Sequence, residues 1–207
     1  MSSDKNLGPA IMERTGYIKL VFHDHLNDTN TYRRLTKDEA SSLIAQTEKG
    51  FDDWFKKYKD QIDHIEYLSH HRAYYENNYN TFYVLPKVHK NKLSTRPIVS
   101  TSGTLLRALG VWCDEKLQIA ARKQRSYFKD TFELKKTLDK IVLPPNAKLF
   151  TSNVVSMYTN IPTKKALQKI AKYLQSTQFK GIPVKALMKA LDSVSYTHLT
   201  LPTTPYV

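Results

Sequence analysis

Two short apolar segments joined by a basic loop place the strongest constraint on how this chain folds. TFYVLP (residues 81–86) and PIVST (residues 97–101) carry the β-branched and aromatic residues that are typical of strands. The segment between them contains no acidic residue, and its basic side chains are Lys87, His89, Lys90, Lys92 and Arg96. The pattern predicts a β-hairpin over residues 81–101 with its positive charge gathered at the tip.

Helical patterns flank this hairpin on both sides. Thr36 and Glu39 have the spacing of a capping box, and apolar residues follow at helical spacing as far as Tyr58. Further helices are expected over about residues 63–76, 105–117, 132–141 behind an N-cap at Thr131, 163–174, and from Pro183 onward. GYIKLVF (residues 16–22) instead predicts a strand. Helices and strands in this order indicate an α+β fold.

The charge of the chain favours a polyanionic partner. Its 32 basic and 19 acidic residues give a formal net charge of +13. A protein that neutralises phosphates releases their condensed counterions, so a basic excess favours nucleic acid. The acid-free loop supports this interpretation. The alternative stays open that the lysines only solvate the helix faces of an interaction protein.

Other classes of protein find less support in the sequence. No apolar run approaches the ~18 residues that span a bilayer, and the polar start MSSDKN is unlike a signal peptide, so we expect no membrane partner. The single Cys113 predicts no disulfide partner and suits an intracellular compartment, nuclear or cytoplasmic. The histidine pairs His23/His25 and His70/His71 stand without cysteines or acids at zinc-ligand spacing.

A third segment, LFTSNVVSMYTNIP (residues 149–162), has the pattern of a strand that runs into a turn. Together with DKNLG (residues 4–8) and with FYVLPKVHK followed by RPIVS, it resembles reverse transcriptases, most closely those of the Penelope-like retroelements. The resemblance covers residues 4 to about 192. It implies the fingers and the first part of the palm of a right-hand polymerase, incomplete, within the α+β class. The implied activity is RNA-directed DNA synthesis, with an RNA template, a DNA primer, deoxynucleoside triphosphates (dNTPs) and Mg²⁺.

The resemblance also implies roles for individual residues. Arg96 would bind the incoming triphosphate, for which its planar charged fork is suited. Tyr158 would be the sugar gate that excludes a 2′-hydroxyl. Position 153 would be the first catalytic, metal-binding acid, and the backbone carbonyl of Val154 would be a further metal ligand. Lesser phosphate or template contacts are expected from Lys5, Lys87, Lys90 and Lys92.

Position 153 is an asparagine in this chain, which departs from the family pattern. Two Mg²⁺ ions in such a site require anionic oxygen ligands, and the amide of Asn153 offers only one neutral oxygen. We therefore expect the chain to be inactive as written. The alternative is a non-catalytic basic nucleic-acid-binding protein derived from such an element.

The final residues of the chain match the translation of a sequencing adaptor. VSYTHLTLPT (residues 194–203) is the translation of GTC TCT TAT ACA CAT CTG ACG CTG CCG ACG, one frame of a transposase-based sequencing adaptor. We therefore expect residues 194–207 to be an adaptor-derived tail. The expected organisation is a fingers-like region over residues 1–145, including the hairpin at 81–101, and the start of a palm over residues 146–193. The family's second and third catalytic acids would lie beyond residue 193, and the apolar helix face around Leu187 and Leu191 would be exposed.

Overall fold

The computed structural model describes residues 3–148, 150–154, 161–177, 179, 181–200 and 203–205. Within these residues the chain has a mixed α+β fold, which confirms the expected fold class at that level. The chain divides into two compact units. The first comprises residues 1–110 and 193–207, and the second comprises residues 111–192.

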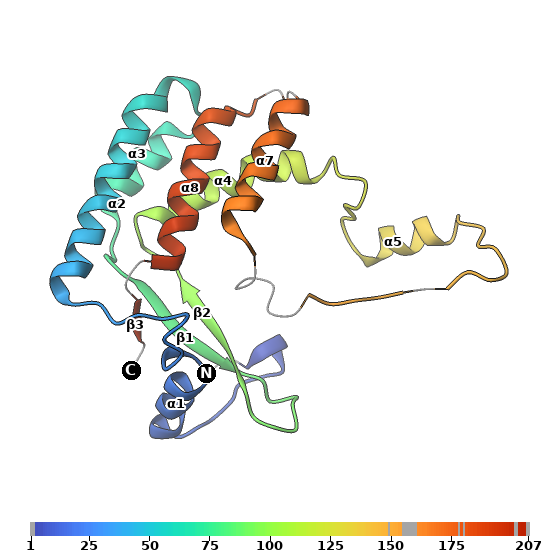
Figure 1. The fold of residues 1–207 in the computed structure, drawn as a ribbon, viewed down its shortest axis with the longest axis horizontal. Coiled ribbons are helices and arrows are strands. Elements are labelled where there is room, and N and C mark those ends of the chain that lie inside the picture. Colours follow the sequence, from blue (N-terminus) through green and yellow to red (C-terminus); the bar gives the residue numbers. More distant parts are fainter. Residues whose placement is uncertain are drawn as a thin grey trace. The chain divides into compact units, whose positions relative to one another are not determined.

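The first unit contains the hairpin and the helices that precede it in the sequence (Figure 1). In chain order its elements before residue 105 are η1 (Asp4–Asn6), α1 (Arg14–Val21), η2 (Phe22–Leu26), α2 (Lys37–Tyr58), η3 (Lys59–Gln61), α3 (Ile65–Tyr74), β1 (Asn80–Pro86) and β2 (Thr95–Ser100). The label η2 denotes a π-helix, and η1 and η3 are 3₁₀-helices.

The predicted hairpin is confirmed. Strands β1 and β2 pair antiparallel in a register that runs from Thr81 opposite Ser100 to Pro86 opposite Thr95. Strand β3 (Thr203–Pro205) pairs parallel with the start of β1, so the strand order is β2-β1-β3. Strand β3 falls within the segment that we predict to be adaptor-derived, and that assignment stays a prediction.

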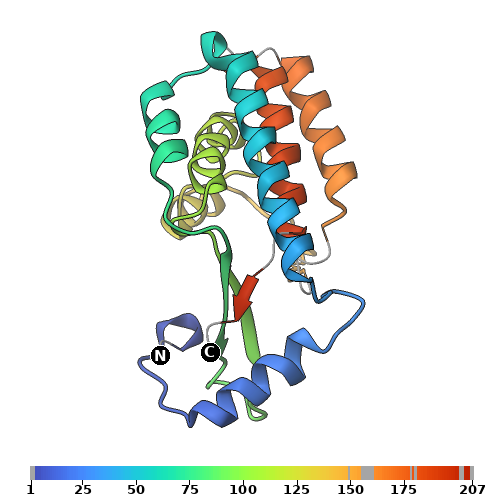
Figure 2. The same ribbon diagram turned by 90° about the vertical axis from the view of Figure 1, so that its left-hand side faces the viewer.

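The strand predicted over residues 16–22 is wrong, because this segment forms α1 and the start of η2. Tyr17 and Val21, four residues apart on one face of the helix, both pack against Phe82 and Val84 of the hairpin. Figure 2 shows α1 and η2 alongside the loop end of the hairpin. A helix therefore buries Tyr17 and Val21 together on one face. A short run of apolar and aromatic residues does not by itself distinguish such a helix from a strand.

Helices α2 and α3 follow the sequence predictions. The predicted capping box is present, since Glu39 N–H donates to the Thr36 hydroxyl at 3.2 Å and Thr36 N–H donates to the Glu39 carboxylate at 2.8 Å. Arg72 of α3 donates to both carboxylate oxygens of Asp52 on α2, at 2.8 and 2.9 Å. The tyrosine hydroxyl of Tyr75 also donates to a carboxylate on α2. These contacts fix the two helices beside each other.

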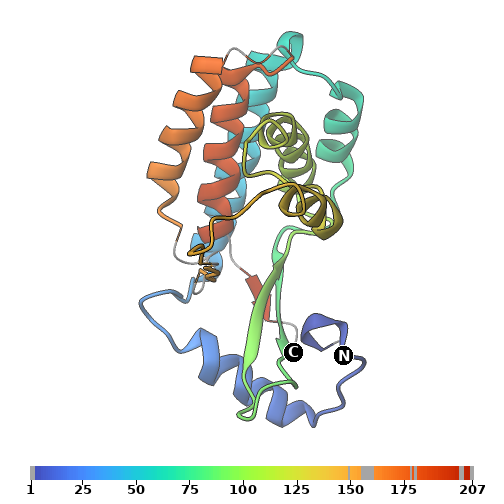
Figure 3. The ribbon, with the colours of Figure 1, turned by 90° about the vertical axis from the view of Figure 1, so that its right-hand side faces the viewer.

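The second unit is helical over its described residues. It holds most of α4 (Leu106–Ala121), then α5 (Thr131–Leu138), α7 (Thr163–Thr177) and α8 up to residue 192, the whole of α8 being Val184–Thr200. Helices α7 and α8 run side by side (Figure 3). The N-cap of α5 is Asp130, whose carboxylate accepts from Glu133 N–H at 2.9 Å, one residue before the predicted Thr131.

The expectation that the face of α8 around Leu187 and Leu191 is exposed is wrong. Leu187 is fully buried and Leu191 is 9% exposed. The helix continues past residue 193, and Val194 is buried as well. Leu187, Leu191 and Val194 of α8 are therefore buried in this structure.

Candidate nucleic-acid interface

The two faces of the hairpin differ in what they contact. Side chains alternate between the faces of a strand, and directly paired residues share a face. Phe82, Val84 and the paired residue Val99 lie on the face that packs against α1 and η2. Leu85 and its partner Arg96 lie on the other face, where Leu85 is half-buried and Arg96 is exposed. The predicted triphosphate-binding Arg96 is therefore on the more open face.

Arg96 contacts a residue from the first of the three family-like segments. Its Nε lies 3.2 Å from Oδ1 of Asp4 in η1. Asp4 is 4% exposed, and its second oxygen, Oδ2, has no hydrogen-bond partner within the described part of the chain. The neighbouring Lys5 is exposed and adopts a left-handed backbone conformation with φ 60°. The structure thus brings Lys5 and Arg96 to the same end of β2.

The hairpin loop presents its charges to solvent. Lys87 N–H donates to the Ser94 carbonyl at 2.8 Å and closes the loop at its base. Lys90 N–H donates to the Lys87 carbonyl at 3.2 Å in a turn, and the side chains of Lys90 and Lys92 are exposed. Lys87 itself is half-buried. The loop therefore holds two exposed cations at a defined turn.

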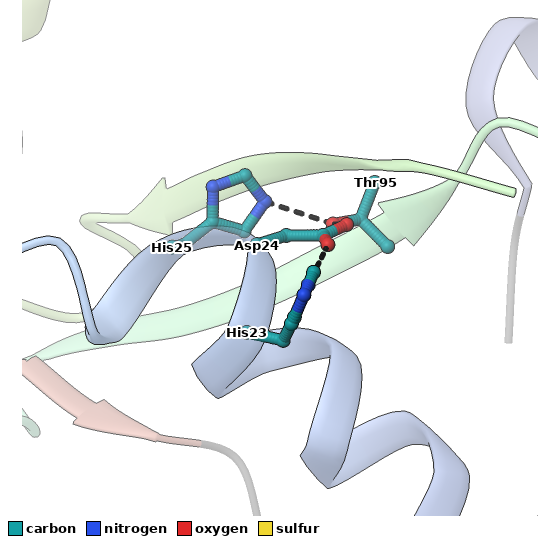
Figure 4. A network of polar contacts seen from close by, with 4 residues as sticks. All are labelled: His23, Asp24, His25 and Thr95. Atoms are coloured by element: carbon teal, nitrogen blue, oxygen red, sulfur yellow. Dashed lines mark hydrogen bonds and ion pairs between the residues drawn. The ribbon is translucent and has the colours of Figure 1, made fainter.

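A hydrogen-bonded chain ties the loop end of β2 to η2 (Figure 4). The buried hydroxyl of Thr95 donates to Asp24 Oδ2 at 2.7 Å, and it lies 2.8 Å from Nε2 of His25. Because that hydroxyl donates to Asp24, His25 Nε2–H is the donor to it. Nδ1 of His23 lies 3.0 Å from the other oxygen of Asp24. Both oxygens of the carboxylate are thus engaged.

This environment shifts the pKa of two groups downward. Burial lowers the pKa of His25, and nearby Lys87 lowers it further, against an opposing effect of Asp24. Burial by itself would raise the pKa of Asp24, but hydrogen bonds from His23 and Thr95 outweigh it and lower that pKa. The ionised Asp24 and the neutral His25 are the forms that this network favours.

An open pocket of ≈ 760 Å³ lies between η2 and the hairpin loop. Its lining includes the three residues from His23 to His25 and the loop residues His89, Lys90 and Lys92. The lining therefore contains three imidazoles and two ammonium groups but a single carboxylate. Such a lining suits an anion rather than a cation.

The predicted catalytic positions lie in the second unit. Asn153 and Val154 are exposed, and residues 150–154 belong to no helix or strand, so the expected strand is not seen in the described part of this segment. Tyr158 lies outside the described residues. No group of three potential metal-ligating side chains occurs among the residues that the structure describes. The neutral amide of Asn153 does not fit the anionic donor set that paired Mg²⁺ ions need.

Sequence reasoning missed four residues that organise this region. Asp4, Tyr17, Asp24 and Thr95 were not singled out, although each contacts a distant segment. Tyr17 is an example of a contact that its local sequence does not reveal. Its hydroxyl accepts a hydrogen bond from Val84 N–H at 2.9 Å, on the side of β1 away from β2. The only sequence signal was the acid between two histidines in HDH (residues 23–25).

Comparison of the chain with protein-family models, with curated proteins and with solved structures found no match. A search of the described residues found no helix long and apolar enough to cross a membrane.

Proposed function

We propose that this chain is the fingers region and the start of the palm of an RNA-directed DNA polymerase of a Penelope-like retrotransposon. In this proposal the hairpin loop contacts the primer–template, and Arg96 with Lys5 contacts the phosphates of a dNTP. The chain as written does not catalyse nucleotidyl transfer, because the position of the first metal-binding acid is Asn153.

The contact between Asp4 and Arg96 carries the proposal. DKNLG and RPIVS are far apart in the sequence, and both belong to the set of segments that carries the resemblance. Their contact at 3.2 Å brings two of the three family-like segments together, which supports a shared site. Among the described residues, Asp4 is the carboxylate that forms an ion pair with the guanidinium of Arg96, and the side chain of Arg96 is 48% exposed. Asp4 thus orients the guanidinium while leaving it accessible to a ligand.

The electrostatics of the hairpin also support nucleic-acid binding. Lys90 and Lys92 project from a loop without acidic residues, on a chain with a net charge of +13. Contacts of this kind position a protein on a phosphate backbone and do not depend on base sequence. Binding should therefore be strong at low salt and weak at high salt.

The test is the salt dependence of binding to an RNA–DNA primer–template, measured by fluorescence anisotropy between about 50 and 200 mM salt. Replacing Lys90 and Lys92 with Gln should weaken binding and reduce the slope of log K against log salt by about one per lysine. The matched control replaces Lys49 and Lys56 of α2, which are also exposed. Equal losses in the two double variants would contradict the proposed interface.

Catalysis is tested separately from binding. Primer extension is compared for Asn153 and Asn153→Asp in a chain completed downstream with the family's remaining catalytic acids. Extension should require the aspartate, since only an ionised carboxylate balances the charge of two Mg²⁺ ions. Equal extension by both chains would refute the role assigned to position 153.

The second candidate function is a non-catalytic nucleic-acid-binding protein that descends from such an element. The exposed Asn153, with a neutral amide in place of an acid, is the observation that favours it. The two candidates differ in the Arg96 site. A polymerase-like site predicts that Arg96→Gln reduces the binding of dNTP to the protein–primer–template complex, whereas the binding protein needs no such site.

A further inference from the structure

The pocket between η2 and the hairpin loop lies on the opposite face of the hairpin from Arg96. Thr95 and Arg96 are successive residues of β2, so their side chains point to opposite faces. Thr95 faces Asp24 and His25 and lines the pocket, whereas Arg96 faces Asp4. The pocket is therefore a separate site from the one proposed for the triphosphate.

The charged side chains that line the pocket are mostly basic. Lys90, Lys92, His89, Asn91 and Ser94 contribute donor groups from the loop side. The only carboxylate in the lining is Asp24, and both of its oxygens already accept hydrogen bonds. A ligand with several anionic oxygens would complement such a surface.

The wall opposite the loop is built on an unusual helix. Residues Phe22–Leu26 form a π-helix, closed by a hydrogen bond from Asn27 N–H to the Phe22 carbonyl at 3.0 Å. Short π-helical segments are frequently found at functional sites. Here the segment presents His23 and Asp24 to the pocket, and Thr95 anchors it to β2.

We propose that this pocket binds the phosphate backbone of a single-stranded nucleic acid. The proposal rests on the proposed function as a nucleic-acid-binding chain, and it adds a second, distinct contact. Its volume of ≈ 760 Å³ exceeds that of a lone phosphate and is in the usual range for ligand sites. Because the pocket is open to solvent, it suits a strand that passes through it rather than an enclosed small molecule.

The first variant removes the only acid of the pocket. Asp24→Asn should tighten binding of a labelled oligouridylate of about 12 nucleotides by about threefold, because the carboxylate repels phosphate at close range. Asp28→Asn is the matched control. Asp28 undergoes the same change of charge four residues later, is fully exposed, also accepts hydrogen bonds from its neighbours, and does not line the pocket.

The second variant adds a cation to the same wall. His23 is exposed and lines the pocket, so His23→Lys should also tighten binding. Asn27→Lys, at an exposed position that does not line the pocket, is its control and should change affinity less. Both test variants predict a gain of affinity that exceeds the gain in a control with the same change of charge.

The outcomes separate the two proposals. Tighter binding by Asp24→Asn and His23→Lys, with smaller changes in the controls, supports the pocket as a backbone site. Binding by the unaltered chain with no gain in either test variant overturns the pocket and leaves the proposed function standing. No salt-dependent binding of the unaltered chain to either the oligouridylate or the primer–template overturns both.

Discussion

The hydroxyl of Tyr17 is the clearest single contact by which α1 holds the hairpin. It accepts a hydrogen bond from Val84 N–H at 2.9 Å, whereas its distance of 3.5 Å to the Val84 carbonyl is too long to contribute much. Val84 is 1% exposed, so water cannot replace the hydroxyl. Tyr17→Phe keeps the ring and leaves a buried donor unsatisfied, which costs about 1–2 kcal/mol.

The effect should be local and measurable by amide hydrogen exchange. A loss of about 1.4 kcal/mol corresponds to about tenfold faster exchange at Val84, if opening of this edge of β1 limits exchange. Tyr74→Phe serves as the control because Tyr74 is 71% exposed on α3. Unchanged protection of Val84 in Tyr17→Phe would refute the role of this hydroxyl.

Three further predictions concern the packing and the titration of the chain. Phe82 is 1% exposed, so Phe82→Ala should lower the free energy of unfolding by about 3–5 kcal/mol in urea. Phe132 is 77% exposed, so Phe132→Ala should change the free energy of unfolding little. Burial raises the pKa of the Cys113 thiol to about 12, so iodoacetamide should label it slowly at about pH 8 until urea unfolds the chain; rapid native labelling would disprove its burial. The pKa of His25 is lowered in the folded chain, so the contribution of His25 to stability is complete above pH 6.5 and is lost as the pH falls through the lowered pKa. The lowered pKa of Asp24 has the same effect below pH 3.8. Urea unfolding at about pH 8 and about pH 5 should therefore show an acid-induced loss that is smaller in His25→Asn, and an identical loss in that variant would contradict this.

Local sequence patterns were sufficient to predict the helices and strands that short-range interactions determine. The capping box of Thr36 and Glu39 marks the start of α2, and the strand composition on either side of the basic loop marks β1 and β2. Residues 16–22 show where such signals fail. The aromatic and β-branched residues of GYIKLVF favour a strand, but burial of Tyr17 and Val21 against the hairpin selects a helix.

The candidate site was predictable only in part, for a similar reason. The basic residues of the loop and Arg96 stand out by composition and by resemblance, and all of them except the half-buried Lys87 are exposed. The partners that orient them do not stand out. Asp4 and Thr95 act through contacts with segments far away in the sequence, and a single sequence carries no record of such pairings.

The central claim is that the hairpin is the nucleic-acid interface of this chain. Ultraviolet cross-linking to a primer–template that carries 4-thiouridine in the template, followed by mass spectrometry of the peptides, tests it most directly. The account predicts cross-links in residues 83–96, and their loss at high salt. Cross-links that concentrate instead on α2 or α5, with none in residues 83–96, would contradict it.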